Sequence, residues 1–256
     1  MDLKLDTTLI EGYTSASQMA RRLTEGWVSH NMYCPRCGNL CVDKTKNNSP
    51  VSDFICPECH NILELKSKNG SLTNKVNDGA YDTMVSRITS STNPDFLFLG
   101  YNRSAMIVED LVVIPKHFFV PSIIEKRKPL APTARRAGWT GCNILLSSVP
   151  EQGRVSVIRS GEEIPQKHVI EKLNRSTSLS KGDIKARGWL FDVLNCVNLI
   201  HGNMFSLVDV YCFVPHLAKR HPDNHNIQAK IRQQLQMLRD AGYIEFLEPG
   251  SYRRLH

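Results

Sequence analysis

Two matched cysteine pairs constrain this chain more than any other feature of its sequence. The pairs are Cys34-Pro-Arg-Cys37 and Cys56-Pro-Glu-Cys59, and 18 residues separate them. This spacing is typical of a structural zinc site, because each pair forms a tight knuckle and supplies two thiolates to one tetrahedral ion. Gly38, which follows the first pair, suits such a turn. The remaining cysteines are expected to be small core or surface residues: Cys41, Cys142, Cys196 and Cys212.

The composition is that of a folded protein with a polyanionic partner. The chain has 256 residues, enough for two modest domains, with 41% apolar and 22% charged residues. A net charge of +7 favours a polyanion but does not distinguish nucleic acid from a membrane surface. No apolar run approaches the ~20 residues of a membrane helix, and residues 1–6 lack a signal-peptide pattern. We therefore expect a cytoplasmic protein with reduced thiols and no membrane partner.

Hydrophobic periodicity predicts mixed α/β structure in the first 182 residues. A helix is expected over 15–30, where apolar residues recur at helical spacing. The other regular elements expected here are a helix over 78–90 and strands over 95–101, 107–114 and 154–159. The Pro- and Arg-rich segment 124–139 predicts no regular structure, and the small polar stretch 174–183 predicts a linker.

After this linker the pattern changes to consecutive helices and a hairpin. Helices are expected over 188–200, from Ser206, and over 225–241, and strands over 243–247 and 251–255. Asp209 makes a variant of the capping box with Ser206, and Gly242 ends the third helix. Three helices followed by a hairpin are the order of a winged helix. We therefore expect an α/β domain at 1–182 and a mainly helical winged-helix domain at 183–256.

The second cysteine pair is flanked by charged residues that a hairpin would bring together. Strands are expected on either side of it, at 51–55 and 61–66. Opposite residues of an antiparallel hairpin have a constant index sum, so a turn centred within the knuckle sets Asp53 opposite Glu64. Lys66 then lies on the same face as Glu64, while Leu65 points into the core.

These residue types suit metal-assisted hydrolysis of a phosphodiester. The carboxylates of Asp53 and Glu64, with the backbone carbonyl of Leu65, are the oxygen ligands that Mg²⁺ prefers. Lys66 would orient or deprotonate the attacking water and offset developing charge. Glu25, on the first expected helix, is a further candidate for assisting the metal. The alternative is a solvated charged strand face, because Glu-x-Lys alone is a weak motif.

Two regions are candidates for contacts with DNA. The segment 126–139 has five basic residues and no acidic one, which suits phosphate contacts, although a solvated loop is the alternative. Its candidates are Lys126, Arg127, Lys128, Arg135, Arg136 and Trp139, the last of which would either wedge into the base stack or belong to the core. Glutamines on the helix at 225–241 can hydrogen-bond the edge of adenine, although a winged helix can also contact protein. The candidates there and on the final hairpin are Gln228, Lys230, Arg232, Gln233, Arg253 and Arg254.

The combination of Asp53 with Glu64-x-Lys66 resembles the PD-(D/E)xK nuclease core. Nearly the whole chain resembles the DpnI-type methyl-directed restriction endonucleases, whose first domain is an α/β PD-(D/E)xK domain with an embedded four-cysteine zinc ribbon. The most specific segments are Tyr33–Gly38, Glu64–Lys68, Asn77–Tyr81, Arg127–Trp139 and Lys230–Gln236. One departure from the general nuclease pattern is Ser52, because a proline often precedes the aspartate, and Pro50 lies three residues before it instead.

This resemblance implies a prokaryotic, monomeric type II enzyme. It implies Mg²⁺-dependent cleavage of double-stranded DNA within GATC, with N6-methyladenine required, and it implies that both domains read the methylated site. The runner-up is a transcription regulator made of a zinc ribbon and a winged helix, which would need no catalytic trio. A repair-type nuclease that senses DNA shape is a third possibility, against which a separate reading helix argues.

Overall fold

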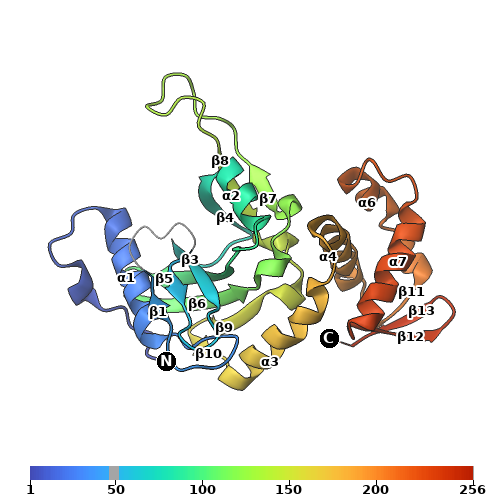
Figure 1. Ribbon diagram of the computed structural model, residues 1–256, viewed down its shortest axis with the longest axis horizontal. Helices are drawn as coiled ribbons and strands as arrows, with labels where there is room; N and C mark the ends of the chain where they lie inside the picture. Colours follow the sequence, from blue (N-terminus) through green and yellow to red (C-terminus); the bar gives the residue numbers. More distant parts are fainter. Residues whose placement is uncertain (46–51, 256) are drawn as a thin grey trace.

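A seven-stranded mixed sheet lies at the centre of the N-terminal part of the computed structural model, which describes residues 1–45 and 52–255 (Figure 1). Its strands follow the order β1-β2-β3-β5-β6-β9-β10. Only β3 and β5 pair in parallel among the described strands of this sheet. The strands are β1 (Asp43–Lys44), β2 (Phe54–Ile55), β3 (Ile62–Asn69), β5 (Asp95–Asn102), β6 (Ile107–Ile114), β9 (Val155–Arg159) and β10 (Glu162–Glu163).

One face of this sheet is covered by the helices α1 (Ala16–Asn31) and α3 (Gln166–Ser176) (Figure 1). Leu23, Trp27 and Val28 of α1 are buried against the apolar side chains of the sheet. The helix expected over 15–30 is confirmed, as are the strands expected over 95–101, 107–114 and 154–159. These are the segments in which burial of apolar side chains and local periodicity agree.

The other face packs against a small sheet and the helix α2 (Tyr81–Ile88). The small sheet has the order β4-β8-β7, with β4 (Lys75–Ala80), β8 (Gly141–Leu145) and β7 (Ile124–Lys126). The helix expected over 78–90 is therefore wrong at 78–80, and the irregular segment expected from 124 begins as a strand. The strands β4 and β7 form because both pair with β8, which comes later in the chain. Local periodicity does not report such a pairing.

The C-terminal part is a set of helices followed by a three-stranded sheet, which is the winged-helix arrangement expected (Figure 1). Its elements are α4 (Ile184–Leu199), β11 (Met204–Ser206), α5 (Leu207–Tyr211), α6 (Val214–Arg220), α7 (Ile227–Asp240), β12 (Ile244–Glu248) and β13 (Ser251–Arg254). The capping box of Ser206 and Asp209 is confirmed, and Gly242 follows α7 in the left-handed conformation. The single helix expected from Ser206 is two helices, because Pro215 in the first turn of α6 cannot continue a preceding helix.

The segment 174–183, expected to be a linker, is helical over most of its length. After α3 ends, a 3₁₀ turn runs over Thr177–Ser180, and Leu179 is fully buried in the core. The hydroxyls of Ser176, Ser178 and Ser180 donate to backbone carbonyls of the preceding turn. The small polar residues thus bond to the helix end instead of remaining solvated, which is why a linker composition was misleading.

The apolar core beneath the small sheet continues into the C-terminal part. Phe191 of α4 stacks on Phe118, with their ring centroids 4.7 Å apart. Further along α4, the side-chain amides of Asn198 and Gln152 hydrogen-bond each other in both directions. The two parts therefore share one continuous core through α4.

His117 is buried next to Phe118, which stacks on Phe191 of α4. We expect this histidine to make the fold less stable in acid. Burial, reinforced by the guanidinium of Arg36, lowers the pKa of His117 to about 4. The unfolded chain binds a proton at His117 near its usual pKa of ~6.5. The free energy of unfolding therefore falls as the pH drops from ~6.5 towards 4, by about 2 kcal/mol between pH 7 and pH 5.

The measurement is urea unfolding of the parent and of His117→Gln at both pH values, followed by circular dichroism. We expect the variant to lose about 2 kcal/mol less than the parent on going from pH 7 to pH 5. His201→Gln, at an exposed position, is the matched control and should behave as the parent. Equal losses in the parent and in His117→Gln would contradict the assignment.

Candidate active site and metal centre

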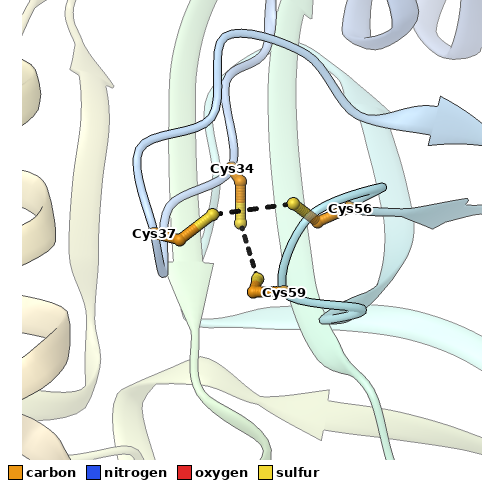
Figure 2. Close-up of side chains that lie close together, drawn as sticks. All are labelled: Cys34, Cys37, Cys56 and Cys59. Atoms are coloured by element: carbon orange, nitrogen blue, oxygen red, sulfur yellow. Dashed lines mark hydrogen bonds between the residues drawn. The ribbon is translucent and has the colours of Figure 1, made fainter.

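Four cysteine thiols converge at one end of the large sheet, as Figure 2 shows. All four sulfur atoms lie within 4.8 Å of one another. The Sγ atoms of Cys34 and Cys59 are 3.5 Å apart, and those of Cys37 and Cys56 are 3.6 Å apart. A tetrahedral zinc ion with Zn–S bonds of ~2.3 Å would hold its sulfur ligands ~3.8 Å apart. The cluster therefore has the composition and spacing of a metal centre with four thiolates.

The two knuckles that carry these thiols have the same backbone geometry. In each, the residue after the second cysteine donates its backbone N–H to the carbonyl of the first cysteine. That residue is Gly38 in the first knuckle and His60 in the second, with φ of 81° and 56°. The expectation that Gly38 serves a tight turn is confirmed, and His60 adopts the same left-handed conformation without the freedom of glycine.

The local electrostatics differ among the thiols of the cluster. Burial raises the pKa of Cys34 and that of Cys59. Burial also opposes ionisation of Cys56, but hydrogen bonds from the backbone N–H groups of Cys59 and Glu58 outweigh it and lower the pKa of Cys56 to about 7. Cys56 therefore ionises more readily than Cys34 and Cys59 when a cation arrives.

An ion pair ties the first knuckle to the sheet. Arg36, between its two cysteines, donates to both carboxylate oxygens of Asp95, at 2.8 and 3.0 Å. Asp95 is completely buried, and its carboxylate also accepts the backbone N–H of Lys116. Gln166 of α3 donates to the carbonyl of Gly38. The knuckle is thus held against the elements that support the rest of the domain.

The second knuckle forms the turn between β2 and β3. Phe54 pairs with Leu63 and Ile55 with Ile62, so the index sum is 117 in both pairs, as predicted. The regular pairing ends at Phe54, and the backbone N–H of Asp53, the next residue, donates to the carbonyl of Leu63. Asp53 Oδ2 also accepts the backbone N–H of Leu65 at 2.8 Å. Residue 51, where the first strand of the hairpin was expected to begin, lies outside the described residues.

Lys66 lies between two carboxylates on this face. Its Nζ is 2.6 Å from Glu64 Oε1 and 2.6 Å from Asp78 Oδ1 of β4. Arg87 of α2 reaches the other oxygen of Glu64 at 2.7 Å. Sequence reasoning did not assign Asp78 or Arg87 to the site. Asp78 does lie within Asn77–Tyr81, one of the segments that carried the family resemblance.

The charge balance of this group favours a bound cation. Burial lowers the pKa of Lys66, but Asp78 and Glu64 outweigh it and hold the pKa above its usual value, so Lys66 is an ammonium ion. Asp53 adds a third carboxylate against the two cations Lys66 and Arg87, which leaves one negative charge in excess. Among the described residues, the four cysteines are the one group of three or more potential ligands whose donor atoms lie close enough together to hold a metal ion.

Glu25 forms ion pairs of its own, and one of its two partners, Arg21, also interacts electrostatically with Asp53. It is nearly buried in α1, and its carboxylate is 2.5 Å from Arg21 and 2.5 Å from Lys44. Both of its oxygens are thus neutralised by cations.

Comparison with protein-family models shows to which family the chain belongs. Residues 1–182 match the model of the Dam-replacing family, and residues 185–254 match that of the Dam-replacing HTH domain. The chain belongs to the Dam-replacing family. This finding agrees with the resemblance drawn from the sequence, and the mixed α/β domain with its four-cysteine cluster and helical C-terminal domain is the fold that was expected. Within residues 1–45 and 52–255, no helix has the length and apolar character that a membrane span requires.

In this member of the Dam-replacing family, a long basic loop projects from the end of the small sheet that carries Asp78 (Figure 1). Asp78 pairs with Cys142 of β8, and Cys142 pairs with Lys126 of β7, so one row across the sheet joins the ion pairs to the root of the loop. The basic candidates of the loop are all exposed: Lys126, Arg127, Lys128, Arg135 and Arg136.

Trp139 closes this loop and is not a core residue. It is partly exposed, packs over Gly141 and lies beneath the guanidinium of Arg136, 4.7 Å from the ring centroid. The backbone of Leu130 exchanges two hydrogen bonds with Gly138 and Trp139, which gives the loop a defined base. The structure therefore excludes the alternative in which Trp139 belongs to the core.

The HTH domain presents most of the expected polar side chains of α7 to solvent. Gln228, Arg232 and Gln233 are exposed. Lys230 is partly buried, with its ammonium 5.9 Å from the ring centroid of Trp189 and hydrogen-bonded to Gln233.

The two arginines of β13 differ in role. Arg253 is exposed and forms an ion pair with Glu245 at 3.3 Å. Arg254 instead donates to the carbonyls of Val197, Asn198, Ile200 and Gly202. Arg254 therefore stabilises the C-terminal end of α4, a structural role that the sequence pattern did not predict.

Proposed function

We propose that this member of the Dam-replacing family is a type II methyl-directed restriction endonuclease. It hydrolyses double-stranded DNA at GATC sites that carry N6-methyladenine, in a Mg²⁺-dependent reaction of the PD-(D/E)xK class. The observation that carries the proposal is Lys66, whose ammonium lies between the carboxylates of Glu64 and Asp78, next to Leu65, whose backbone N–H donates to Asp53.

The oxygen atoms of this group fit a hard divalent cation. Asp53 and Glu64 would hold Mg²⁺ together with the backbone carbonyl of Leu65, since Mg²⁺ takes oxygen ligands and is commonly held by one or two carboxylates. The excess negative charge of the group favours such a cation. When bound, Mg²⁺ supplies Lewis-acid activation of a phosphate and lowers the pKa of a bound water.

Neighbouring side chains hold Glu64 and Lys66 in place. Glu64 is nearly buried, and its two oxygens are fixed by Lys66 and Arg87. The ammonium of Lys66 is fixed in turn by Asp78, and it would donate a hydrogen bond to the attacking water and offset negative charge that develops on the phosphate. Its raised pKa favours this electrostatic role over that of a general base.

A structural zinc ion would occupy the four-cysteine cluster. Four thiolates complete its coordination sphere and leave no position for substrate. Cys56 and Cys59 lie in the turn between β2, which follows Asp53, and β3, which carries Glu64. The metal would therefore fix the hairpin register instead of taking part in the chemistry.

The two domains, for which we propose the limits 1–182 and 183–256, would both contact the duplex. The exposed basic loop that ends at Trp139 would bind phosphates next to the catalytic group. On α7, Gln228, Lys230, Arg232 and Gln233 would enter the major groove, and Arg253 would contact phosphate. We place the enzyme in the cytoplasm of a prokaryotic cell and expect it to act as a monomer.

The test uses one plasmid prepared from cells that methylate adenine in GATC and from cells that do not. We expect the purified protein with Mg²⁺ to cut the methylated plasmid into the GATC fragment pattern and to leave the unmethylated plasmid intact. A gel resolves the products. Cutting of both plasmids would retain the nuclease and remove the methyl requirement. Binding without cutting of either would favour the transcription regulator, which shares the cysteine cluster and the HTH domain.

A further inference from the structure

A pocket opens on the same face of the large sheet as Glu64 and Lys66. It has a volume of about 580 Å³ and lies between the end of β6, β9, α3 and the start of the small sheet. One row of paired residues joins the two places, because Lys66 pairs with Phe98, Phe98 with Val112 and Val112 with Ser156. Val112 and Ser156 line the pocket. With ~4.8 Å between strands, Ser156 lies about 15 Å from Lys66 along the sheet.

Four cations converge on the rim of this pocket: Arg154, Arg159, Lys172 and Arg175. Among the described residues none of the four forms an ion pair with a carboxylate. Arg159 donates to the hydroxyl of Ser156, and Lys172 donates to the carbonyl of Arg154. Two carboxylates, Glu151 and Glu171, also line the pocket, so its net charge is +2 when His168 is neutral. The rim therefore has unbalanced positive charge.

The cations of the rim repel one another at Lys172. Burial lowers the pKa of Lys172, and the nearby Arg159 and Arg154 lower it further, although Glu151 opposes them. An anion bound in the pocket would relieve that repulsion and favour the charged lysine. Arginines present planar donor groups that match the oxygens of a phosphate.

The floor of the pocket has a different chemistry from its rim. Leu72, Val112, Ile114 and Leu146 supply apolar surface, and Asn74 and Gln152 supply amides beside it. A pocket of this size with an apolar floor and a few polar groups has the character of a small-molecule site. A simple inorganic anion would leave the floor unused.

We propose that this pocket binds a nucleoside 5′-phosphate, with the phosphate on the arginines and lysine of the rim and the base against the apolar floor. Two ligands have this chemistry. One is a free nucleotide, and the other is a nucleotide of the DNA strand that continues from the catalytic group. The ligand is defined by the pocket alone and does not depend on the cleavage reaction proposed above.

The direct test is isothermal titration of the full chain, without Mg²⁺ and at low salt, with the four deoxynucleoside 5′-monophosphates. Deoxynucleosides and inorganic phosphate are titrated in parallel. The test variant is Arg154→Ala combined with Arg175→Ala, since both side chains are exposed and their loss leaves the core intact. We expect at least tenfold weaker nucleotide binding by the double variant. Lys185→Ala, an exposed basic residue outside the pocket, should bind as the parent does, and thermal melting checks that each variant is folded.

A second measurement, the anisotropy of a labelled methylated duplex, distinguishes the two sources. Displacement of the nucleotide by the duplex, with weaker and less salt-dependent duplex binding by the double variant, assigns the pocket to a nucleotide of the DNA strand. Nucleotide binding that the duplex does not displace assigns it to a free nucleotide. The proposal is overturned if parent and double variant show equal affinity for both ligands, or if inorganic phosphate binds as tightly as the nucleotides. Both measurements report binding and not DNA cleavage. A negative result would therefore contradict the nucleotide pocket without contradicting the proposed nuclease activity.

Discussion

Asp53→Ala and Lys66→Ala are each expected to abolish DNA cleavage while leaving DNA binding in place. Asp53 supplies a carboxylate that accepts the backbone N–H of Leu65, and Lys66 supplies an ammonium that contacts both Glu64 and Asp78. Loss of a metal ligand or of a charge that stabilises the transition state costs about 10³-fold or more in rate. The exposed loop and α7, which we assign to binding, are untouched by either substitution.

The measurement pairs a cleavage time course with a gel-shift titration of the same methylated duplex. Asp53→Asn is included because its side-chain carbonyl still accepts the N–H of Leu65, so a loss of activity there reflects the missing charge and not a distorted hairpin. Lys75→Ala is the matched control, since this lysine lies on the neighbouring strand β4 and forms an exposed ion pair with Glu125. Cleavage by Asp53→Ala at the parent rate would remove the catalytic assignment. Loss of binding in step with cleavage would move Lys66 from catalysis to DNA contact.

The register of the catalytic hairpin was predictable because every residue that fixes it is local. The knuckle sets the centre of the turn, and the constant index sum then pairs Phe54 with Leu63 across it and brings Asp53 next to Leu65. The cysteine pairing was predictable for the same reason, since two short motifs carry all four ligands. Burial of β5 and of the second half of β6 followed from their apolar runs, over 96–99 and 111–114, which a sheet covered on both faces requires.

The partners of Lys66 and Glu64 were not predictable in this way. Asp78 reaches Lys66 because β4 crosses over the large sheet, and β4 is a strand only through its pairing with β8, more than 60 residues later in the chain. Arg87 reaches Glu64 from α2, whose position depends on that same strand. Local periodicity cannot report a pairing between segments so far apart, so the helix was placed over residues that belong to β4. Long-range strand pairing thus supplied the part of the site that sequence reasoning missed.

Removal of the zinc ion that we propose for the four-cysteine cluster is expected to unfold the hairpin and so abolish cleavage indirectly. The knuckle of Cys56 and Cys59 is the whole connection between β2 and β3, and Cys34 and Cys56 are completely buried. A structural zinc ion contributes about 10–16 kcal/mol of binding free energy at neutral pH, which becomes folding free energy when the site forms only in the folded chain. Without it, burial opposes ionisation of Cys34, and the neutral thiols have no ligand to hold the two knuckles together.

The experiment strips the metal with a chelator, removes the chelator by desalting, and returns Mg²⁺ alone or Mg²⁺ with Zn²⁺. Circular dichroism and thermal melting report folding, and the methylated plasmid reports cleavage. We expect a lower melting temperature and no cleavage with Mg²⁺ alone, and recovery of both when Zn²⁺ is added. Cys59→Ser should reproduce the stripped state, whereas Cys212→Ser, at an exposed cysteine outside the cluster, should retain one bound zinc and full activity. Full cleavage by a folded, zinc-free chain would show that the hairpin keeps its register without the metal, and the register would then rest on the packing of the paired, buried side chains of Phe54 and Leu63.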